Sequence, residues 1–197
     1  MTFRLGLTGS IGMGKSTTAR MFSDAGCAVW DADAAVHRLY AKGGSAVAAI
    51  GDLFPDAVVA DVVDRTALRQ VIDADPDALR QIENIVHPLV RADRARFADE
   101  AEADIIVFDI PLLFETGSET EMDAVTCVTV SADIQENRVM ARQTMTRDQF
   151  SSIRDKQMSN AEKCHRSDYV IETDTLEHAR QQVHDVVSDI RRYMTDA

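Results

Sequence analysis

Residues 7–17, which read LTGSIGMGKST, contain the first pattern in the chain that could do chemistry. Residues 9–16 fit the spacing G-x-x-x-x-G-K-[ST], and they stand between an apolar run and a helical pattern. Glycines at these places let backbone N–H groups turn toward phosphate oxygens without a Cβ atom in the way. We therefore expect a site for the phosphates of a nucleoside triphosphate. Its predicted members are Gly9, Gly12, Met13, Gly14, Lys15, Ser16 and Thr17.

Two side chains of this loop have roles that the pattern defines. Lys15 would reach the β- and γ-phosphates as a point charge, and the Ser16 hydroxyl would ligate Mg²⁺. The start of the following helix adds the positive end of its dipole. A chance match in a structural turn is the alternative, but the lysine, the hydroxyl and the strand–loop–helix context are all present. The loop predicts binding of ATP or GTP and leaves the reaction open.

Carboxylates stand at the ends of two predicted strands. In open α/β sheets, ligands bind outside the carboxyl ends of the strands. Asp31 and Asp33, in WDAD, would share one side of an extended segment, where a carboxylate could orient an acceptor hydroxyl and take its proton. The alternative is that one of them caps a helix starting near Ala34. Asp109, in VFDIP, either belongs to the Mg²⁺ shell or caps the turn before Pro111.

Basic residues gather in one part of the chain. Between Arg138 and Arg166 there are seven basic residues against three acidic ones. Arg138 and Arg142 are four apart at the end of a predicted helix, so they lie on one face and could clamp transferring phosphates. The alternative is a solvated helix surface. The polar, helical stretch 144–167 that follows is typical of a lid that closes over a nucleotide and excludes water.

Short β-rich runs alternate with helical patterns along the chain, which favours an α/β fold with a parallel sheet covered by helices. The run 104–110 is nearly all apolar, as expected for a central strand buried on both faces. A helix should follow the first strand over about 15–25. The five predicted strands are 3–8, 27–32, 104–110, 123–130 and 168–172.

A long, mostly helical stretch over about 34–102 separates the second and third strands. Its clearest helix should begin with Asp75 as N-cap and Pro76 in the first position, and Pro88 should kink or break it. His87 would then project from an irregular turn, or it is simply a structural residue. The apolar stripe expected to face the core is Leu79, Ile82, Val86 and Leu89 or Val90. The last helix should bury Leu176, Ala179, Val183, Val187, Ile190 and Met194.

Composition excludes several classes of protein. With 33 acidic and 21 basic residues the formal charge is −12, which argues against a nucleic-acid-coating protein. Cys27, Cys127 and Cys164 have no metal-ligand spacing, and an odd number does not make a disulfide framework, so we expect reduced thiols. The strongest apolar run, IIVFDIPLLF, is too short to span a bilayer. We therefore expect a soluble, cytoplasmic protein without a membrane partner.

Taken together, the motifs resemble one family, dephospho-CoA kinase, over nearly the whole chain. The matching stretches, in family order, are LTGSIGMGKST, DAD, DRTAL, IENIVHPLV, DIPLLFE, QENRVMAR, QMSNAEK and SDYVIE. The glycine loop is generic, whereas HPLV and IPLLFE together with DAD are fairly specific. The resemblance implies a transferase that uses ATP with Mg²⁺ to phosphorylate the 3′-hydroxyl of dephospho-CoA, the last step of coenzyme A synthesis.

The resemblance also implies an architecture. We expect an adenylate-kinase-like protein with a P-loop nucleoside-triphosphate hydrolase fold: a five-stranded parallel sheet flanked by helices, with a helical substrate-binding segment and a lid. The core would cover about 1–33, 103–137 and 167–197, the substrate-binding segment about 34–102, and the lid about 138–166. The protein would be a monomer or a weak homo-oligomer.

Site residues follow from the resemblance by position. Asp33 is the expected base at the acceptor hydroxyl, and Lys15, Arg138 and Arg142 complete the catalytic set. Thr173 stands where many members carry asparagine, near the expected contact to the adenine ring. The residues expected at the acceptor site are Thr8, Asp31, Asp33, His87, Leu112, Leu113 and Phe114.

Other functions remain as alternatives at this point. Another P-loop kinase, such as one acting on nucleoside monophosphates, would have the same core chemistry and a different acceptor. A GTPase switch would need an N-K-x-D stretch for guanine, which is absent, and a D-x-x-G after the third strand, where the chain reads DIPL. The intact DAD and the paired arginines speak against a nucleotide sensor without catalysis.

Overall fold

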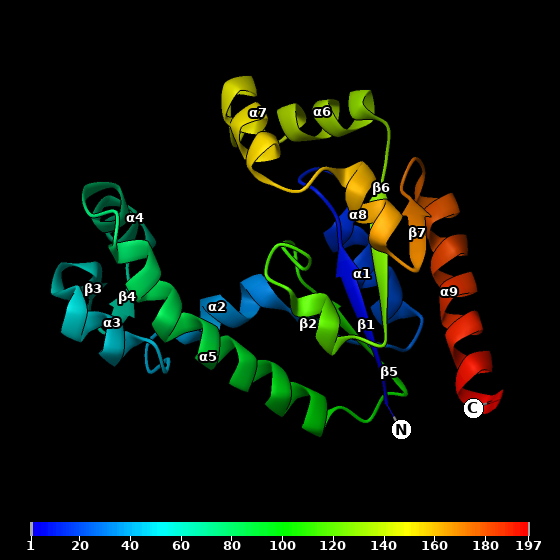
Figure 1. Cartoon of the computed structure of the whole chain (residues 1–197), viewed down its shortest axis with the longest axis horizontal. Helices are drawn as coiled ribbons and strands as arrows, with labels where there is room; N and C mark the ends of the chain where they lie inside the picture. The colour runs from blue at the N-terminus through cyan, green and yellow to red at the C-terminus, as the bar shows by residue number, and fades with distance from the viewer. Residues whose placement is uncertain (1, 197) are drawn as a thin grey trace. The chain divides into compact units, whose positions relative to one another are not determined.

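A five-stranded parallel sheet forms the centre of the computed structural model, which describes residues 2–196 (Figure 1). The strand order is β2-β5-β1-β6-β7, so β1 lies between β5 and β6. Phe3 pairs with Ile105 on one side, and Leu5 pairs with Ala124 on the other. The predicted α/β class and all five strands are confirmed. The strands are β1 (Phe3–Thr8), β2 (Ala28–Asp31), β5 (Ile105–Asp109), β6 (Ala124–Thr129) and β7 (Tyr169–Glu172).

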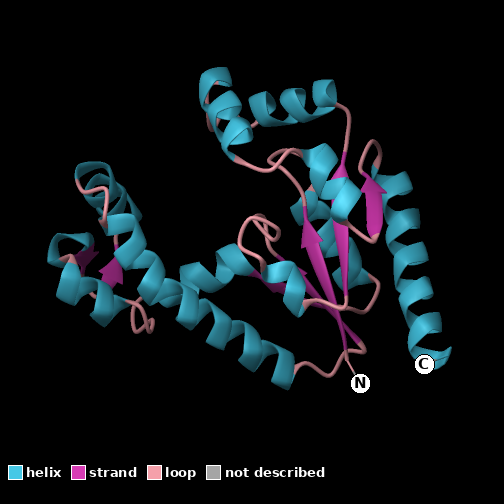
Figure 2. Cartoon of the chain, in the orientation of Figure 1, coloured by secondary structure: helices cyan, strands magenta, loops and turns pink. Residues whose placement is uncertain are grey.

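The middle strands are buried on both faces because helices cover the sheet (Figure 2). Leu5 and Leu7 of β1 are fully buried, and every residue of β5 is buried. Phe22 of α1 and Val183 of α9 share their core cluster. The helices of this part are α1 (Lys15–Asp24), α6 (Ala132–Ala141), α7 (Arg147–Lys156), α8 (Asn160–Arg166) and α9 (Leu176–Asp196), with the 3₁₀ turn η2 at Ser118–Glu121.

Most of the stripe predicted on the last helix is confirmed; its last member, Met194, is partly buried against the core, and its first member is not buried. Ala179, Val183, Val187 and Ile190 are buried, whereas Leu176 is 64% exposed. Leu176 is wrong as a core residue because it opens α9 beyond the sheet and instead lines the cavity described below.

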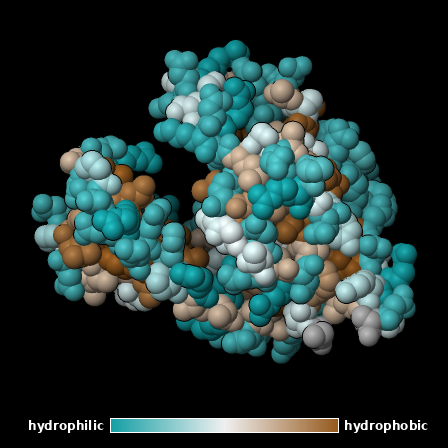
Figure 3. Space-filling view, viewed as in Figure 1, coloured by the Kyte–Doolittle hydropathy of each residue, from teal (hydrophilic) through white to brown (hydrophobic). Residues whose placement is uncertain are grey.

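Polar residues dominate α6 and α7, the stretch in which a lid was predicted. The surface over these two helices is mostly hydrophilic in Figure 3. A capping box begins α7: the Thr146 hydroxyl accepts from the Gln149 N–H, and the Gln149 side chain accepts from the Thr146 N–H. The helical character of the stretch therefore rests on local polar signals, and Phe150 is the residue of α7 that is buried.

The described chain divides into two compact units: one contains the chain up to Trp30 and from Ala101, and the other is Asp31–Glu100. The second unit has its own core, which includes Leu39, Ile50 and Leu68. Its elements are α2 (Ala32–Tyr40), α3 (Val47–Leu53), η1 (Pro55–Ala57), β3 (Val58–Val59), β4 (Val62–Val63), α4 (Arg65–Ala74) and α5 (Ala78–Glu100).

The second unit departs from the sequence prediction along α5. The helix continues through Pro88, so the predicted break is wrong. Ile82 and Val86 before the proline and Leu89 after it pack against the same core, which holds both halves in one helix.

The start of α5 also differs from the prediction. Asp75 is the C-cap of α4, and its carboxylate accepts the Asp77 N–H at 2.9 Å, so α5 begins only at Ala78. The predicted start of the helix is therefore wrong, although the Asp75 carboxylate makes the bond to the N–H two residues on that was expected of a capping residue. Leu79 is 46% exposed because Ala78, which is fully buried, takes the position that faces the core.

A short antiparallel hairpin, β3–β4, was not predicted in this mostly helical unit. Its two turn residues, Ala60 and Asp61, have φ of 51° and 63°. Two successive left-handed residues match the twist of a tight hairpin, but the usual asparagine–glycine signal is missing from the sequence.

Candidate active site

The glycine loop lies between β1 and α1, at the carboxyl end of the central strand (Figure 1). Gly12 and Gly14 have φ of 79° and 93°, a region that side chains rarely adopt. A Cβ atom at Gly12 would come within 2.6 Å of Val139 Cγ2, and one at Gly14 within 2.9 Å of Thr173 Oγ1. Both positions therefore require glycine for conformation and for space.

The first turn of α1 presents backbone donors. Gly14 is the N-cap residue and has no side chain to cap the helix. The N–H groups of Thr17 and Thr18 both bond to the Gly14 carbonyl at 3.1 Å. The N–H groups of Lys15 and Ser16 precede them, where a helix has no internal acceptors, so this turn is built to bind an anion.

Three polar side chains brace the loop from outside, and sequence reasoning gave none of them this role. Gln135 Nε2 of α6 donates to the Ile11 carbonyl at 2.7 Å. Asn160 Oδ1 of α8 accepts the Ser10 N–H at 3.1 Å, and Thr173 Oγ1 after β7 donates to the Met13 carbonyl at 2.8 Å. The first two stand in the motif stretches QENRVMAR and QMSNAEK, but nothing in the sequence shows which backbone they reach.

Lys15 and Asp109 form an ion pair at the mouth of the loop. The Lys15 side chain is 15% exposed and the Asp109 side chain 2% exposed. The carboxylate that ends β5 therefore lies beside the lysine of the phosphate loop. Of the two roles predicted for Asp109, this position suits the one close to the phosphates.

Arg138 and Arg142 line a cavity of about 340 Å³ together with Gly14, Thr17 and Thr173. Arg138 belongs to the last turn of α6 and Arg142 is its C-cap, as predicted. Arg138 donates to Thr173 Oγ1 at 3.0 Å and to the Thr173 carbonyl at 2.5 Å. The arginine pair and the glycine loop are thus brought together, and a simple solvated surface is wrong for Arg138.

The DAD stretch differs from its prediction in local structure. Asp31 ends β2, and its carboxylate accepts the Ala34 N–H at 2.9 Å, which caps α2. Because α2 begins at Ala32, Asp33 stands in the first helical turn with an exposed side chain. The predicted extended segment with both carboxylates on one side is wrong, and Asp31 has the capping role that was its alternative.

The residues expected at the acceptor vary in exposure. Thr8 is fully buried, and its hydroxyl donates to the Pro111 carbonyl at 3.1 Å. Leu112 is 39% exposed, Leu113 is fully buried, and the Phe114 ring lies 4.5 Å from the Arg166 guanidinium carbon. Leu112 therefore offers most of the apolar surface of this loop.

His87 lies in the second unit, within the continuous part of α5. Its side chain is exposed and projects from a regular helix. The irregular turn predicted around it is therefore wrong.

All three cysteines are free, as predicted. Burial raises the pKa of the Cys27 thiol to about 11, and burial and the Cys164 thiol raise the pKa of Cys127. Thiols with such raised pKa values are protonated at neutral pH, and both of these thiols are buried.

This fold and site define the class. A parallel sheet with β1 in its centre, a braced glycine loop, a lysine–carboxylate pair at its mouth and two arginines on the adjoining cavity make the chain a P-loop kinase-like protein. The shikimate kinase of Acinetobacter baumannii shares the fold at 14% identity, with a TM-score of 0.53 over 98% of this chain and 95% of that one.

The chain belongs to the dephospho-CoA kinase family, whose sequence model matches residues 3–178. A dephospho-CoA kinase from Ruegeria pomeroyi is 68% identical over 97% of both chains, and one from Cereibacter sphaeroides is 54% identical over 96% of both. The crystal structure of TT1252 from Thermus thermophilus is 32% identical and covers 95% of this chain and 97% of that one, with a TM-score of 0.86. These matches confirm the family predicted from the motifs and do not support the alternative, a P-loop kinase of another small acceptor.

Within the described residues, no helix is long and apolar enough to cross a membrane.

Proposed function

We propose that this chain transfers the γ-phosphoryl group of ATP to the 3′-hydroxyl of dephospho-CoA, giving coenzyme A and ADP. Phosphoryl transfer is supported by one observation above the others: the braced loop, whose donors and Lys15 meet at the end of β1. The choice of acceptor follows from membership of the dephospho-CoA kinase family and from the full-length match to relatives of that name.

The phosphates of ATP would bind at the first turn of α1. The N–H groups of Gly14, Lys15 and Ser16 would bond to phosphate oxygens, and the Lys15 ammonium would stabilise charge that moves during transfer. Gly9, Gly12, Met13 and Thr17 complete this binding loop.

The residues present fit a Mg²⁺ ion that arrives with ATP. The Ser16 hydroxyl, on the first turn of α1, and the Asp109 carboxylate, beside Lys15, are oxygen donors at the loop. Among residues 2–196 no group of three or more His, Cys, Asp or Glu side chains could hold a metal ion, so water and phosphate would supply most ligands, as is usual for Mg²⁺. Bound Mg²⁺ neutralises charge on the transferring phosphates.

The cavity beside the loop would hold the nucleoside part of ATP. It borders the first turn of α1 through Gly14 and Thr17, so a nucleotide with its phosphates on the loop would extend into it. Arg142 and Arg138 would bind the phosphates from the α6 side by charge-assisted hydrogen bonds. Arg138 is already oriented by both oxygens of Thr173.

Asp33 would act as the base at the acceptor hydroxyl. Asp31 is engaged in capping α2, which leaves Asp33 as the carboxylate of the pair to take the proton. Thr8, Asp31, His87 and the Leu112–Phe114 stretch would bind the acceptor, by their match to the family pattern. We also place the enzyme in the cytoplasm, as a monomer or weak homo-oligomer.

The test is a panel of acceptors offered to purified protein with ATP and Mg²⁺. ADP release is followed with dephospho-CoA, AMP and adenosine as acceptors. We expect ADP release with dephospho-CoA as acceptor and none with AMP or adenosine. Turnover of AMP or adenosine with dephospho-CoA inert would refute the proposed function. A Lys15→Met variant serves as the control for contaminating kinases, because it keeps the loop glycines and removes the charge that the reaction needs.

A further inference from the structure

Lys163 of α8 has no exposed surface, although lysine is among the residues least often buried. Its ammonium nitrogen lies 3.0 Å from the Pro111 carbonyl oxygen and 2.9 Å from Glu115 Oε1. A buried charge is tolerated when it is paired and hydrogen-bonded, and both acceptors come from the loop that follows β5. The proposed reaction assigns Lys163 no role.

Each of the two oxygens that accept from Lys163 also accepts a hydrogen bond from a second donor. Glu115 Oε1 also accepts the Met158 N–H at 3.1 Å, just before α8 begins. The Pro111 carbonyl also accepts the Thr8 hydroxyl at 3.1 Å, at the end of β1. One ammonium therefore connects the end of β1, the loop after β5 and the segment that leads from α7 into α8.

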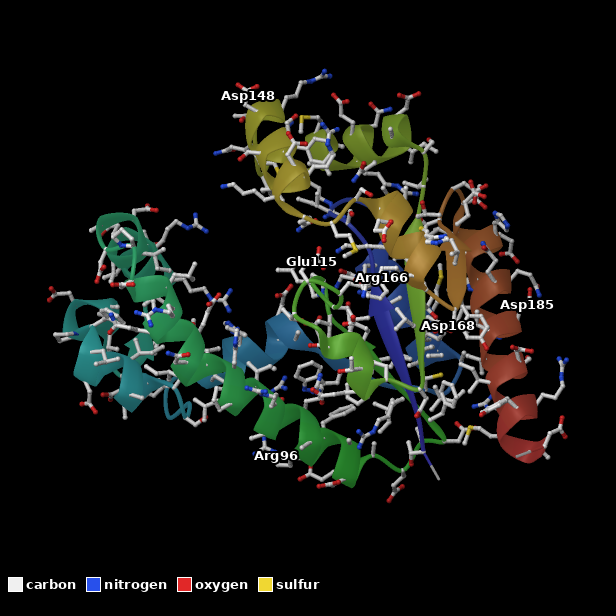
Figure 4. The ribbon with its side chains drawn as sticks, viewed as in Figure 1. Arg96, Glu115, Asp148, Arg166, Asp168 and Asp185 are labelled. Atoms are coloured by element: carbon white, nitrogen blue, oxygen red, sulfur yellow. The ribbon has the colours of Figure 1, made fainter. Side chains whose placement is uncertain are left out.

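The same loop carries groups that the proposed reaction uses. It follows Asp109, the last residue of β5, which pairs with Lys15, and it contains Leu112–Phe114. Figure 4 shows Glu115 on this loop and Arg166 on α8, and the Arg166 guanidinium covers the Phe114 ring. Lys163 is thus buried against this loop and contacts it through one carbonyl and one carboxylate.

We propose that Lys163 is a positioning residue for the acceptor: with Glu115 it fixes the Pro111–Glu115 loop against α8 and so places the acceptor-lining residues relative to the phosphate loop. This inference rests on the proposed function, because it assigns that loop to the acceptor. Methionine at 163 has no donor for either oxygen, so the Pro111–Glu115 loop loses a defined position, while the glycine loop keeps the braces from Gln135 and Thr173, which lie outside α8.

A purely structural role for Lys163 makes a different prediction. It would lower stability, and it would leave the kinetics of the folded fraction unchanged for both substrates. A positioning role separates the substrates, because the nucleotide binds on a loop that Gln135 and Thr173 brace from outside α8. The decisive readout is therefore the split between acceptor kinetics and nucleotide affinity.

The experiment compares wild type with Lys163→Met, Glu115→Gln and the double variant. For each, kcat and KM are measured with dephospho-CoA, ATP affinity is measured by calorimetry, and thermal unfolding reports the folded fraction. We expect Lys163→Met to lower kcat/KM for dephospho-CoA by about 10- to 100-fold, the range that small displacements cause. Affinity for ATP should stay within about twofold of wild type.

Glu115→Gln keeps an acceptor for Lys163 and removes the charge, so its loss should be smaller and of the same kind. Its side chain is 21% exposed, which makes it the variant to rely on if Lys163→Met does not fold. The double variant should lose no more than Lys163→Met alone, because both act through one contact. Arg191→Gln, which breaks the pair with Asp104 before β5, is the matched control and should leave both substrates unaffected.

Three outcomes are decisive. Wild-type turnover of dephospho-CoA supports the proposed function independently of any variant. Given that turnover, equal losses for acceptor and nucleotide, or a lower melting temperature with unchanged kinetics, would overturn the positioning role. If wild type does not use dephospho-CoA, the proposed function itself fails.

Discussion

Replacing Thr173 by valine tests how the phosphate loop is held open. Valine has the shape of threonine, so the substitution removes the hydroxyl and little else. Thr173 is 6% exposed, and its hydroxyl donates to the Met13 carbonyl at 2.8 Å and accepts from Arg138 at 3.0 Å. The loop carbonyl then has no side-chain donor, and Arg138 keeps only its bond to the Thr173 carbonyl.

The expected magnitude follows from these two contacts. A buried hydrogen-bonding group that loses its partner costs about 1–3 kcal/mol. If this cost falls on the loop conformation that binds phosphate, ATP affinity decreases by about 5- to 150-fold. The free energy of unfolding should fall by an amount in the same range, because the brace also links β7 to the loop.

Calorimetric titration with ATP and urea unfolding measure the two effects on one sample. Thr195→Val is the matched control: its hydroxyl bonds to the Arg191 carbonyl at 2.8 Å on the exposed end of α9. That variant should change the free energy of unfolding by less than about 0.5 kcal/mol and leave ATP affinity unchanged. If Thr173→Val binds ATP as tightly as wild type does, the idea that this hydroxyl holds the loop is refuted.

Four further outcomes are expected. Asp33→Asn should lower kcat by about 100-fold or more with ATP affinity unchanged, and full turnover would remove Asp33 as the base. Gly14→Ala should abolish ATP binding, since a Cβ would meet Thr173 at 2.9 Å and a left-handed alanine costs about 1–2 kcal/mol; normal binding would contradict the geometry. With a pKa near 11, Cys27 should react with iodoacetamide about 500-fold more slowly at pH 8 than at pH 11, as peptide mass spectrometry would show; equal rates would contradict the raised pKa. The Arg191 hydrogen bond lowers the pKa of Asp104 from 3.8, so this pair stabilises the fold above pH 3.8 and the stabilisation is lost as pH falls through the lowered pKa. In urea unfolding at acid pH, the stability difference between wild type and Arg191→Gln should therefore shrink, and a constant difference would refute the pairing.

The central sheet could be predicted because its signals are local. β5 is apolar up to its last residue, Asp109, and the G-x-x-x-x-G-K-[ST] spacing after β1 indicates the strand–loop–helix order on its own. The second unit was harder, since tertiary packing overrides local preference there. Pro88 reads as a helix breaker, yet core contacts on both sides of it keep α5 continuous.

The residues of the site also divide into those that the sequence could identify and those that it could not. Lys15 and Arg138 could be found because their residue types and spacing carry the function. The braces Gln135, Asn160 and Thr173 could not, because each is an ordinary polar residue whose importance lies in a contact with backbone far along the chain. Lys163 also escaped notice, as only the structure shows that it is fully buried.

The most direct test of the account is the identity of the reaction product. Wild-type protein is incubated with ATP, Mg²⁺ and dephospho-CoA, and phosphorus NMR follows the new ester. A phosphomonoester on the ribose 3′-oxygen, formed in step with ADP and absent in Lys15→Met, is the predicted result. A phosphate on any other oxygen, or ADP release with the acceptor unchanged, would contradict a loop and a base arranged for that one hydroxyl.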